Sequence, residues 1–259
     1  HPAGCANFYP TNCIITLNHI GTRCALVGCT FPNHEDRTMN KLALVSAVAA
    51  SLALPIAGHA AEQSAHTVTG NVGIFSNYIF RGVSQTSEKP AVQGGFDYAH
   101  ASGFYAGAWG SNVSWLSDIT AYTGSSVELD VYGGYKGTIG KSDFGFDVGG
   151  IYYYYPGDRN TSLSADTTEV YGALSWKWLT AKLSYVTGDY FGIADADGTM
   201  YFDVSASYPI GKSGVTLLAH VGSLKMSGTG NDVLDYTDWK VGATYALPRD
   251  FIIGAVYSD

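Results

Sequence analysis

From residue 67 onward the chain repeats one unit, a run of about ten residues in which apolar and polar side chains alternate, followed by a break. In the clearest runs the charges lie on one face only: Val127, Leu129 and Val131 alternate with Glu128 and Asp130. Successive strand residues point to opposite faces, so such a run has one apolar and one charged side. The pattern predicts eleven strands, over residues 67–80, 91–100, 104–115, 127–136, 144–155, 168–176, 179–187, 200–208, 215–224, 239–247 and 251–257.

The links between these strands alternate between long and short. The long links are 81–90, 116–126, 156–167, 188–199 and 225–238, and the short links are 101–103, 137–142, 177–178, 209–214 and 248–249. Outer-membrane barrels have tight periplasmic turns and longer extracellular loops, whereas Greek-key sandwiches do not sort their links in this way. The chain is therefore predicted to form an all-β, antiparallel, up-and-down transmembrane β-barrel.

Aromatic residues gather near the predicted strand ends, as they do at the two water boundaries of membrane barrels. They are Tyr78, Phe80, residues 152–155, Trp176, Trp178, Tyr208, Trp239 and Tyr245. The general preference of Tyr and Trp for strands accounts for this feature equally well.

Such a barrel needs an even number of strands, because it must close in lipid without an unpaired edge. Eleven is odd, so we expect a barrel of twelve strands of which about eleven are present, with the closing strand missing after residue 259.

The first sixty residues are expected to lie outside the barrel. Met39 begins a secretory signal with Lys41, an apolar run over 42–53 and small residues before a cleavage site near Ala60 or Ala61. We therefore divide the chain into a non-native, disordered upstream extension (1–38), a signal peptide (39–61) and a C-terminally truncated barrel (62–259). All four cysteines (Cys5, Cys13, Cys24 and Cys29) fall in the extension, and their spacing lacks the C-x-x-C pair of a zinc ribbon.

Composition agrees with the pattern. Only 14% of the residues are charged, against about 25% in a typical soluble domain, while Gly (32) and Tyr (19) are abundant. Glycine at this level argues against a helical bundle. The formal charge of −8 and the absence of basic runs argue against a nucleic-acid partner.

Three segments, NVGIFSNYIFRGVSQT (71–86), PAVQGGFDY (90–98) and GFYAGAWGSN (103–112), resemble the opening of the TorF porin family. The likeness extends over about residues 67–259 and implies a proteobacterial outer-membrane barrel that acts as a porin. It implies no catalytic residues. Members of that family end in a closing strand with a terminal aromatic residue, which this chain lacks.

The charged faces of the strands supply the candidate pore-lining residues. These are Arg81, Asp97, Glu128, Asp130, Lys136, Asp147, Glu169, Lys177, Lys182, Asp203, His220 and Lys240. The excess of carboxylates predicts a mild preference for cations. Arg81 has two readings: a contact in a constriction, or a rim residue paired with Glu88 or with lipopolysaccharide phosphate.

Several functions remain open at this point. The sequence favours passive diffusion of small hydrophilic solutes through the outer membrane of a Gram-negative bacterium, in contact with lipid and lipopolysaccharide, and leaves a homo-oligomer open. A non-conducting structural or adhesive barrel and a soluble secreted β-sandwich are the alternatives. A hydrolytic barrel would need His220 beside a serine such as Ser184 and a carboxylate, and the chain is predicted not to be an enzyme. No cofactor or metal is expected.

Overall fold

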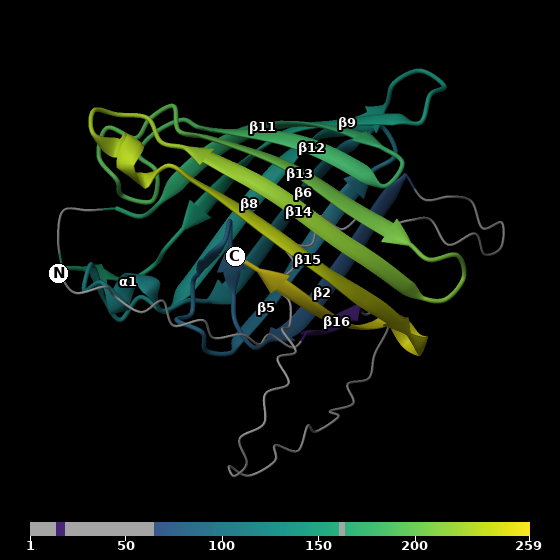
Figure 1. Ribbon diagram of the computed structural model, residues 1–259, viewed down its shortest axis with the longest axis horizontal. Coiled ribbons are helices and arrows are strands. Elements are labelled where there is room, and N and C mark those ends of the chain that lie inside the picture. The colour runs from purple at the N-terminus through teal and green to yellow at the C-terminus, as the bar shows by residue number, and fades with distance from the viewer. Residues whose placement is uncertain (1–13, 19–64, 161–163) are drawn as a thin grey trace, which may run out of the picture.

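Eleven long antiparallel strands form the wall of the molecule. The computed structural model describes residues 14–18, 65–160 and 164–259, and Figure 1 shows the strands as a tilted, wrapped sheet. The strands are β2 (His66–Phe75), β5 (Ala91–His100), β6 (Phe104–Asn112), β8 (Val127–Thr138), β9 (Phe144–Tyr154), β11 (Thr167–Trp176), β12 (Leu179–Val186), β13 (Met200–Pro209), β14 (Val215–Lys225), β15 (Tyr236–Leu247) and β16 (Phe251–Ser258). Each pairs with the next in chain order, as predicted.

A short twelfth strand, β1 (Ile14–Asn18), closes the ring between β16 and β2. Ile14 pairs with Gly254 on one side, and Ile15 pairs with Ile74 on the other. The expectation that residues 1–38 are disordered is therefore wrong for 14–18, because the two edge strands offer unpaired backbone groups that this segment satisfies. The rest of the predicted extension, its cysteines and the signal peptide at 39–61 lie outside the described residues.

The apolar faces of the strands point outward, away from the interior of the barrel. Phe96 is 72% exposed, Val131 56% and Val148 50%, whereas Glu128 and Glu169 are each 1% exposed. A soluble sandwich would bury its apolar faces between two sheets. The closed ring with apolar side chains outside and carboxylates inside contradicts that alternative.

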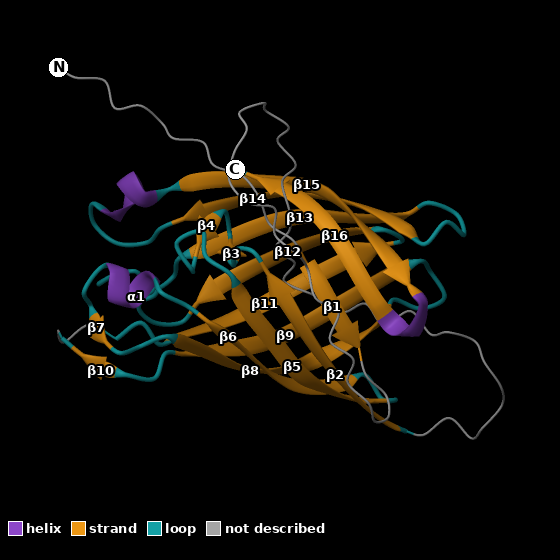
Figure 2. Ribbon diagram, turned by 90° about the horizontal axis from the view of Figure 1, so that it is seen from below, coloured by secondary structure: helices purple, strands orange, loops and turns teal. Residues whose placement is uncertain are grey.

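The links sort to opposite ends of the barrel as expected. The long links 76–90, 113–126, 155–166, 187–199 and 226–235 form what we call the loop end, and the short links form the turn end. The loop end carries α1 (Trp115–Asp118), the paired strands β7 (Tyr122–Thr123) and β10 (Asp158–Arg159), the hairpin of β3 (Ile79–Phe80) and β4 (Val83–Ser84), and η1 (Asn231–Leu234). The turn end carries η2 (Pro248–Asp250), and Figure 2 shows it opposite α1, β7 and β10.

Outward aromatic rings line both ends of the strands. Phe104 packs on Tyr135 and Trp178 on Tyr208 at the turn end, with ring centroids 5.0 and 5.6 Å apart. Four residues predicted in this outer belt lie inside the barrel instead: Tyr78, Tyr153 and Tyr155 are 3%, 5% and 3% exposed, and Phe80 packs against the same inner cluster. Among the described residues, no helix has the length and apolar character needed to cross a membrane.

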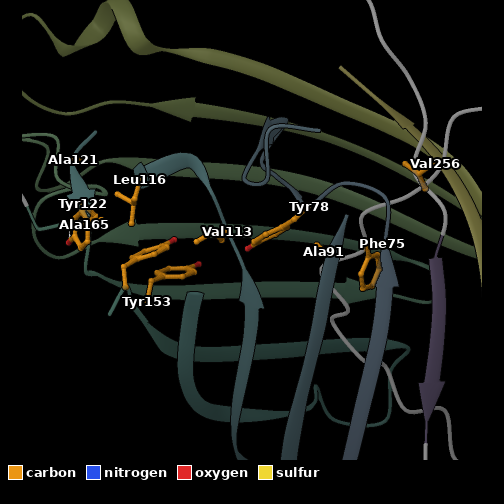
Figure 3. Close-up of a cluster of buried hydrophobic side chains, with 11 residues drawn as sticks. Phe75, Tyr78, Ala91, Val113, Leu116, Ala121, Tyr122, Tyr153, Ala165 and Val256 are labelled. Carbon is orange, nitrogen blue, oxygen red and sulfur yellow. Dashed lines mark hydrogen bonds between the residues drawn. The ribbon is translucent and has the colours of Figure 1, made fainter. Parts of the chain in front are cut away.

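The long links fold inward and fill the loop end with apolar side chains. Leu116 from α1, Val113 and Tyr122 are buried there against Tyr153 of β9 (Figure 3). Phe191 packs between them, with its ring 5.2 Å from that of Tyr153. Burial of these side chains stabilises the inward position of the loops.

Candidate functional site

The hairpin of β3 and β4 projects into the interior of the barrel. Its two-residue turn, Arg81 and Gly82, has positive φ angles of 48° and 79°, the geometry of a tight hairpin turn. A Cβ atom on Gly82 would lie 2.6 Å from Cβ of Asp238, so the tip lies directly against β15. The sequence predicted a wall strand as far as residue 80, but the chain leaves the wall after Phe75.

Arg81 at the hairpin tip forms a buried ion pair with Glu169 of β11. Its two terminal nitrogens donate to Oε1 and Oε2 of Glu169 at 2.7 and 2.8 Å. The guanidinium carbon lies 4.3 Å from the ring centroid of Tyr201 and 4.7 Å from that of Phe80. The side chains of Arg81 and Glu169 are 8% and 1% exposed. Such a bidentate, stacked pair is the strong form of this interaction.

A second contact joins the hairpin to the acidic wall. Tyr78 donates from Oη to Oε1 of Glu128 at 2.9 Å. Burial raises the pKa of Tyr78 well above its usual value, and the charge of Glu128 adds to the effect, so this hydroxyl stays protonated and donates. Oε2 of Glu128 and Oδ1 of Asp130 are buried without a hydrogen-bond partner in the described chain.

His220 lies in a network on the opposite wall. Oγ of Ser205 donates to Asp203 and lies 3.0 Å from Nδ1 of His220, while Nε2 of His220 lies 3.1 Å from Oδ1 of Asp238. Oη of Tyr201 also lies 3.0 Å from Nε2 of His220. Ser205, not Ser184, is the serine beside His220.

Tyrosines and glycines together shape the inner wall nearer the turn end. A Cβ atom on Gly107 would lie 2.4 Å from the ring of Tyr132, and one on Gly149 would lie 2.7 Å from Oη of Tyr171. In each pair the tyrosine side chain occupies the space that a Cβ atom on the glycine of the neighbouring strand would need. Tyr105 donates to Oδ1 of Asp147 at 2.6 Å, so the rings also hold the carboxylates in place.

The predicted pore-lining residues lie on the inner faces of their strands, with two corrections. Lys177 lies in the turn between β11 and β12, is half exposed, and pairs with Asp143 at 3.6 Å. Arg81 pairs with Glu169 rather than with Glu88 or the rim. The inner faces of β5, β8, β9 and β11 carry Asp97, Glu128, Asp130, Asp147 and Glu169, with Lys136 at the turn end. Those of β12–β15 carry Lys182, Asp203, His220, Asp238 and Lys240.

Besides Ser205, sequence reasoning missed Asp238, Tyr153, Tyr201 and Tyr190. Asp238 was placed in a long link, but β15 begins at Tyr236, and Asp238 shares the inner face with Lys240. Extending the alternation by one step would have found it. The same alternation that places Glu169 and Asp203 on the inner face also places Tyr153 and Tyr201 there. Tyr190 lies in a loop and gave no sequence signal.

The described part of the chain contains no candidate metal-binding group. Within residues 65–160 and 164–259, no three His, Cys, Asp or Glu side chains are arranged to hold an ion. The carboxylates of the interior are instead distributed among tyrosines, Arg81 and His220.

The base of the hairpin is tied to α1. The backbone N–H of Ser114 donates to the carbonyl of Gln85 at 2.8 Å. The hydroxyl groups of Ser87 and Ser114 both donate to Oδ2 of Asp118. These donations hold the pKa of the Asp118 carboxyl below its usual value.

This anchor predicts an acid dependence. A folded-state pKa below the unfolded one means that the contribution of Asp118 is complete above the unfolded value of about 4. The contribution is lost as the pH falls through the lower, folded value. Ser114→Ala is expected to raise the Asp118 pKa towards its ordinary value, as followed by carbon-detected NMR. Ser117→Ala is the control, because Ser117 donates to the carbonyl of Ser114 instead. An equal shift in both variants would contradict the assignment.

Residues 59–259, which contain all eleven long strands, match the family described as "Bacterial protein of unknown function (Gcw_chp)". The chain belongs to this family. No curated protein matches it. This match does not by itself show the resemblance of the opening segments to the TorF porins.

Solved structures similar to this chain include two of OprD. The outer membrane protein OprD from Pseudomonas aeruginosa has 16% identity and a TM-score of 0.35, over 74% of this chain and 65% of that chain. A double variant of OccD1 (OprD) has 13% identity and a TM-score of 0.35, over 74% and 65%. The chain thus spans just under two thirds of the solved chains that it matches.

Proposed function

We propose that this member of the Gcw_chp family is an outer-membrane channel for passive diffusion of small hydrophilic solutes, narrowed by the β3–β4 hairpin. One observation carries the proposal. The wall is apolar outside and charged inside, with Val148 exposed one residue from the inward Asp147. A barrel in lipid needs the first face, and a polar lumen needs the second.

The proposal includes the location and the surroundings of the protein. The predicted signal peptide, the outer aromatic rings and the resemblance to TorF porins support export to the outer membrane of a Gram-negative bacterium. Lipid and lipopolysaccharide would cover the outer face. Passive diffusion would involve no chemical step.

The packed loop end favours a second candidate, a non-conducting barrel that presents its loops at the cell surface. Leu116, Tyr122 and Phe191 fill the space through which a solute would enter. In the channel proposal these loops and the hairpin must move to admit a solute. In the second candidate they stay in place.

Single-channel recording in planar bilayers separates the two candidates. The refolded full chain is expected to give stepwise currents, and under a KCl gradient the reversal potential is expected to favour K⁺, because carboxylates exceed basic groups on the inner wall. Absence of any current would support the non-conducting barrel. Currents that favour Cl⁻ would contradict the cation preference alone.

A pair of variants at Ala173 tests whether the lumen charges act on the ions. Ala173 lies on β11 with Asp147 and Lys182 as its strand neighbours. Ala173→Glu is expected to shift the reversal potential further towards K⁺, and Ala173→Arg to shift it back. Shifts in the same direction would show that this inner face does not line the path.

A further inference from the structure

The guanidinium group of Arg81 is held as a ligand is held in a binding site. Both oxygens of Glu169 accept from it, and the ring of Tyr201 lies under its plane at 4.3 Å. Oη of Tyr190 lies 3.5 Å from Nη1. A planar fork of donors between a carboxylate and an aromatic face is the arrangement that selects guanidinium over ammonium.

The binding groups and the bound group come from different parts of the chain. Glu169 and Tyr201 stand on the wall strands β11 and β13, and Tyr190 belongs to the link after β12. Arg81 comes from the hairpin, as does the Phe80 ring that stacks on it at 4.7 Å, and the Arg81 φ of 48° is one that residues other than glycine rarely adopt. The carboxylate of Glu169 and the aromatic face of Tyr201 therefore remain without the hairpin, and the hairpin tip keeps a strained backbone while Arg81 is bound there.

The acidic wall continues beside this site. Glu128 is 1% exposed and Asp130 is 6% exposed, and each has a buried oxygen without a hydrogen-bond partner in the described chain. Buried carboxylate oxygens are stabilised by a cation or a donor. Tyr78 of the same hairpin donates to Glu128, so withdrawal of the hairpin would remove a donor from Glu128 as well as the partner of Glu169.

We propose that Glu169, Tyr190 and Tyr201 form a binding site for the guanidinium group of a small solute, and that Arg81 occupies this site when no such solute is bound. A guanidinium-bearing solute enters the lumen by exchange with the hairpin tip, passing next to Glu128 and Asp130. The entry step rests on the proposed channel function, whereas the binding site is a property of the folded barrel whether or not it conducts.

The test removes the guanidinium group of Arg81 and adds a small guanidinium compound in solution. The refolded full chain in detergent is titrated with N-ethylguanidinium chloride by isothermal calorimetry, with ethylammonium chloride at equal ionic strength as the control. Arg81→Ala is expected to bind N-ethylguanidinium at least about tenfold more tightly than the wild-type chain does, because the site is no longer filled. It is also expected to prefer this probe to ethylammonium. The double variant Arg81→Ala/Glu169→Gln is expected to lose this increase in affinity for N-ethylguanidinium.

Equal binding by Arg81→Ala and by the double variant would overturn the site, and so would equal binding of the two probes. If Arg81→Ala does not refold by itself, its refolding yield becomes the readout, and N-ethylguanidinium but not ethylammonium must restore it. Bilayer recordings are scored separately. Binding of the probe without conductance would refute the channel function and support the binding site. Conductance without binding would support the channel function and refute the binding site.

Discussion

Replacement of Glu169 by Gln is expected to lower the free energy of unfolding by about 3–5 kcal/mol, because Arg81 then keeps a buried charge without its partner. Arg81→Met is expected to cost a similar amount by leaving Glu169 alone. The side chains are 8% and 1% exposed, so solvent does not replace the lost contact. Urea titration of the protein refolded in lipid vesicles, followed by tryptophan fluorescence, measures the loss.

The matched control removes both charges at once. Arg81→Met/Glu169→Leu is expected to be less destabilised than either single variant, since a buried pair replaced by apolar groups leaves no uncompensated charge. Single variants within about 1 kcal/mol of the wild type would show that the pair behaves like an exposed one. The hairpin tip would then not be anchored by it.

A charge on the outer face should be equally damaging, for a different reason. Val148 lies near the middle of β9 and is 50% exposed on the apolar side of the wall. Val148→Arg is expected to lower the free energy of unfolding in vesicles by about 2–4 kcal/mol, the cost of arginine at the bilayer midplane. The same urea titration measures it.

Ala173→Arg is the control at the same height. Val148 pairs with Gly172, and the next pair joins Asp147 to Ala173 on the inner face. The new arginine would face the lumen beside Asp147, so we expect less than half of the loss caused by Val148→Arg. Equal losses would contradict the assignment of the outer face to lipid.

The wall could be predicted from the sequence because alternation is a local signal. Glu128 and Asp130 are inward because the residues on either side of each are apolar, and no distant contact is needed to tell the faces apart. The predicted strand 127–136 corresponds to Val127–Thr138, and 239–247 to Tyr236–Leu247. Errors concentrate where the alternation continues past the end of the wall, as at Tyr78.

The site could be predicted only in part. The alternation of apolar and polar residues predicts that Glu169, Asp203 and His220 lie on inner faces. It does not predict which side chains they contact. Arg81 and Glu169 are far apart in sequence, and they meet because a hairpin turns into the barrel and reaches across it. Alternation is the same for a strand that stays in the wall and for a short hairpin that leaves it.

The sequence alone determined the strands, their faces and the order of long and short links, since each of these depends on neighbours along the chain. Only the tertiary structure decided which segment closes the ring, where the first loop goes and which charges neutralise one another. β1 closes the ring through backbone pairing with two strands that are remote in sequence. The Arg81 site likewise depends on groups brought together by the closed barrel, and no local pattern encodes such a meeting.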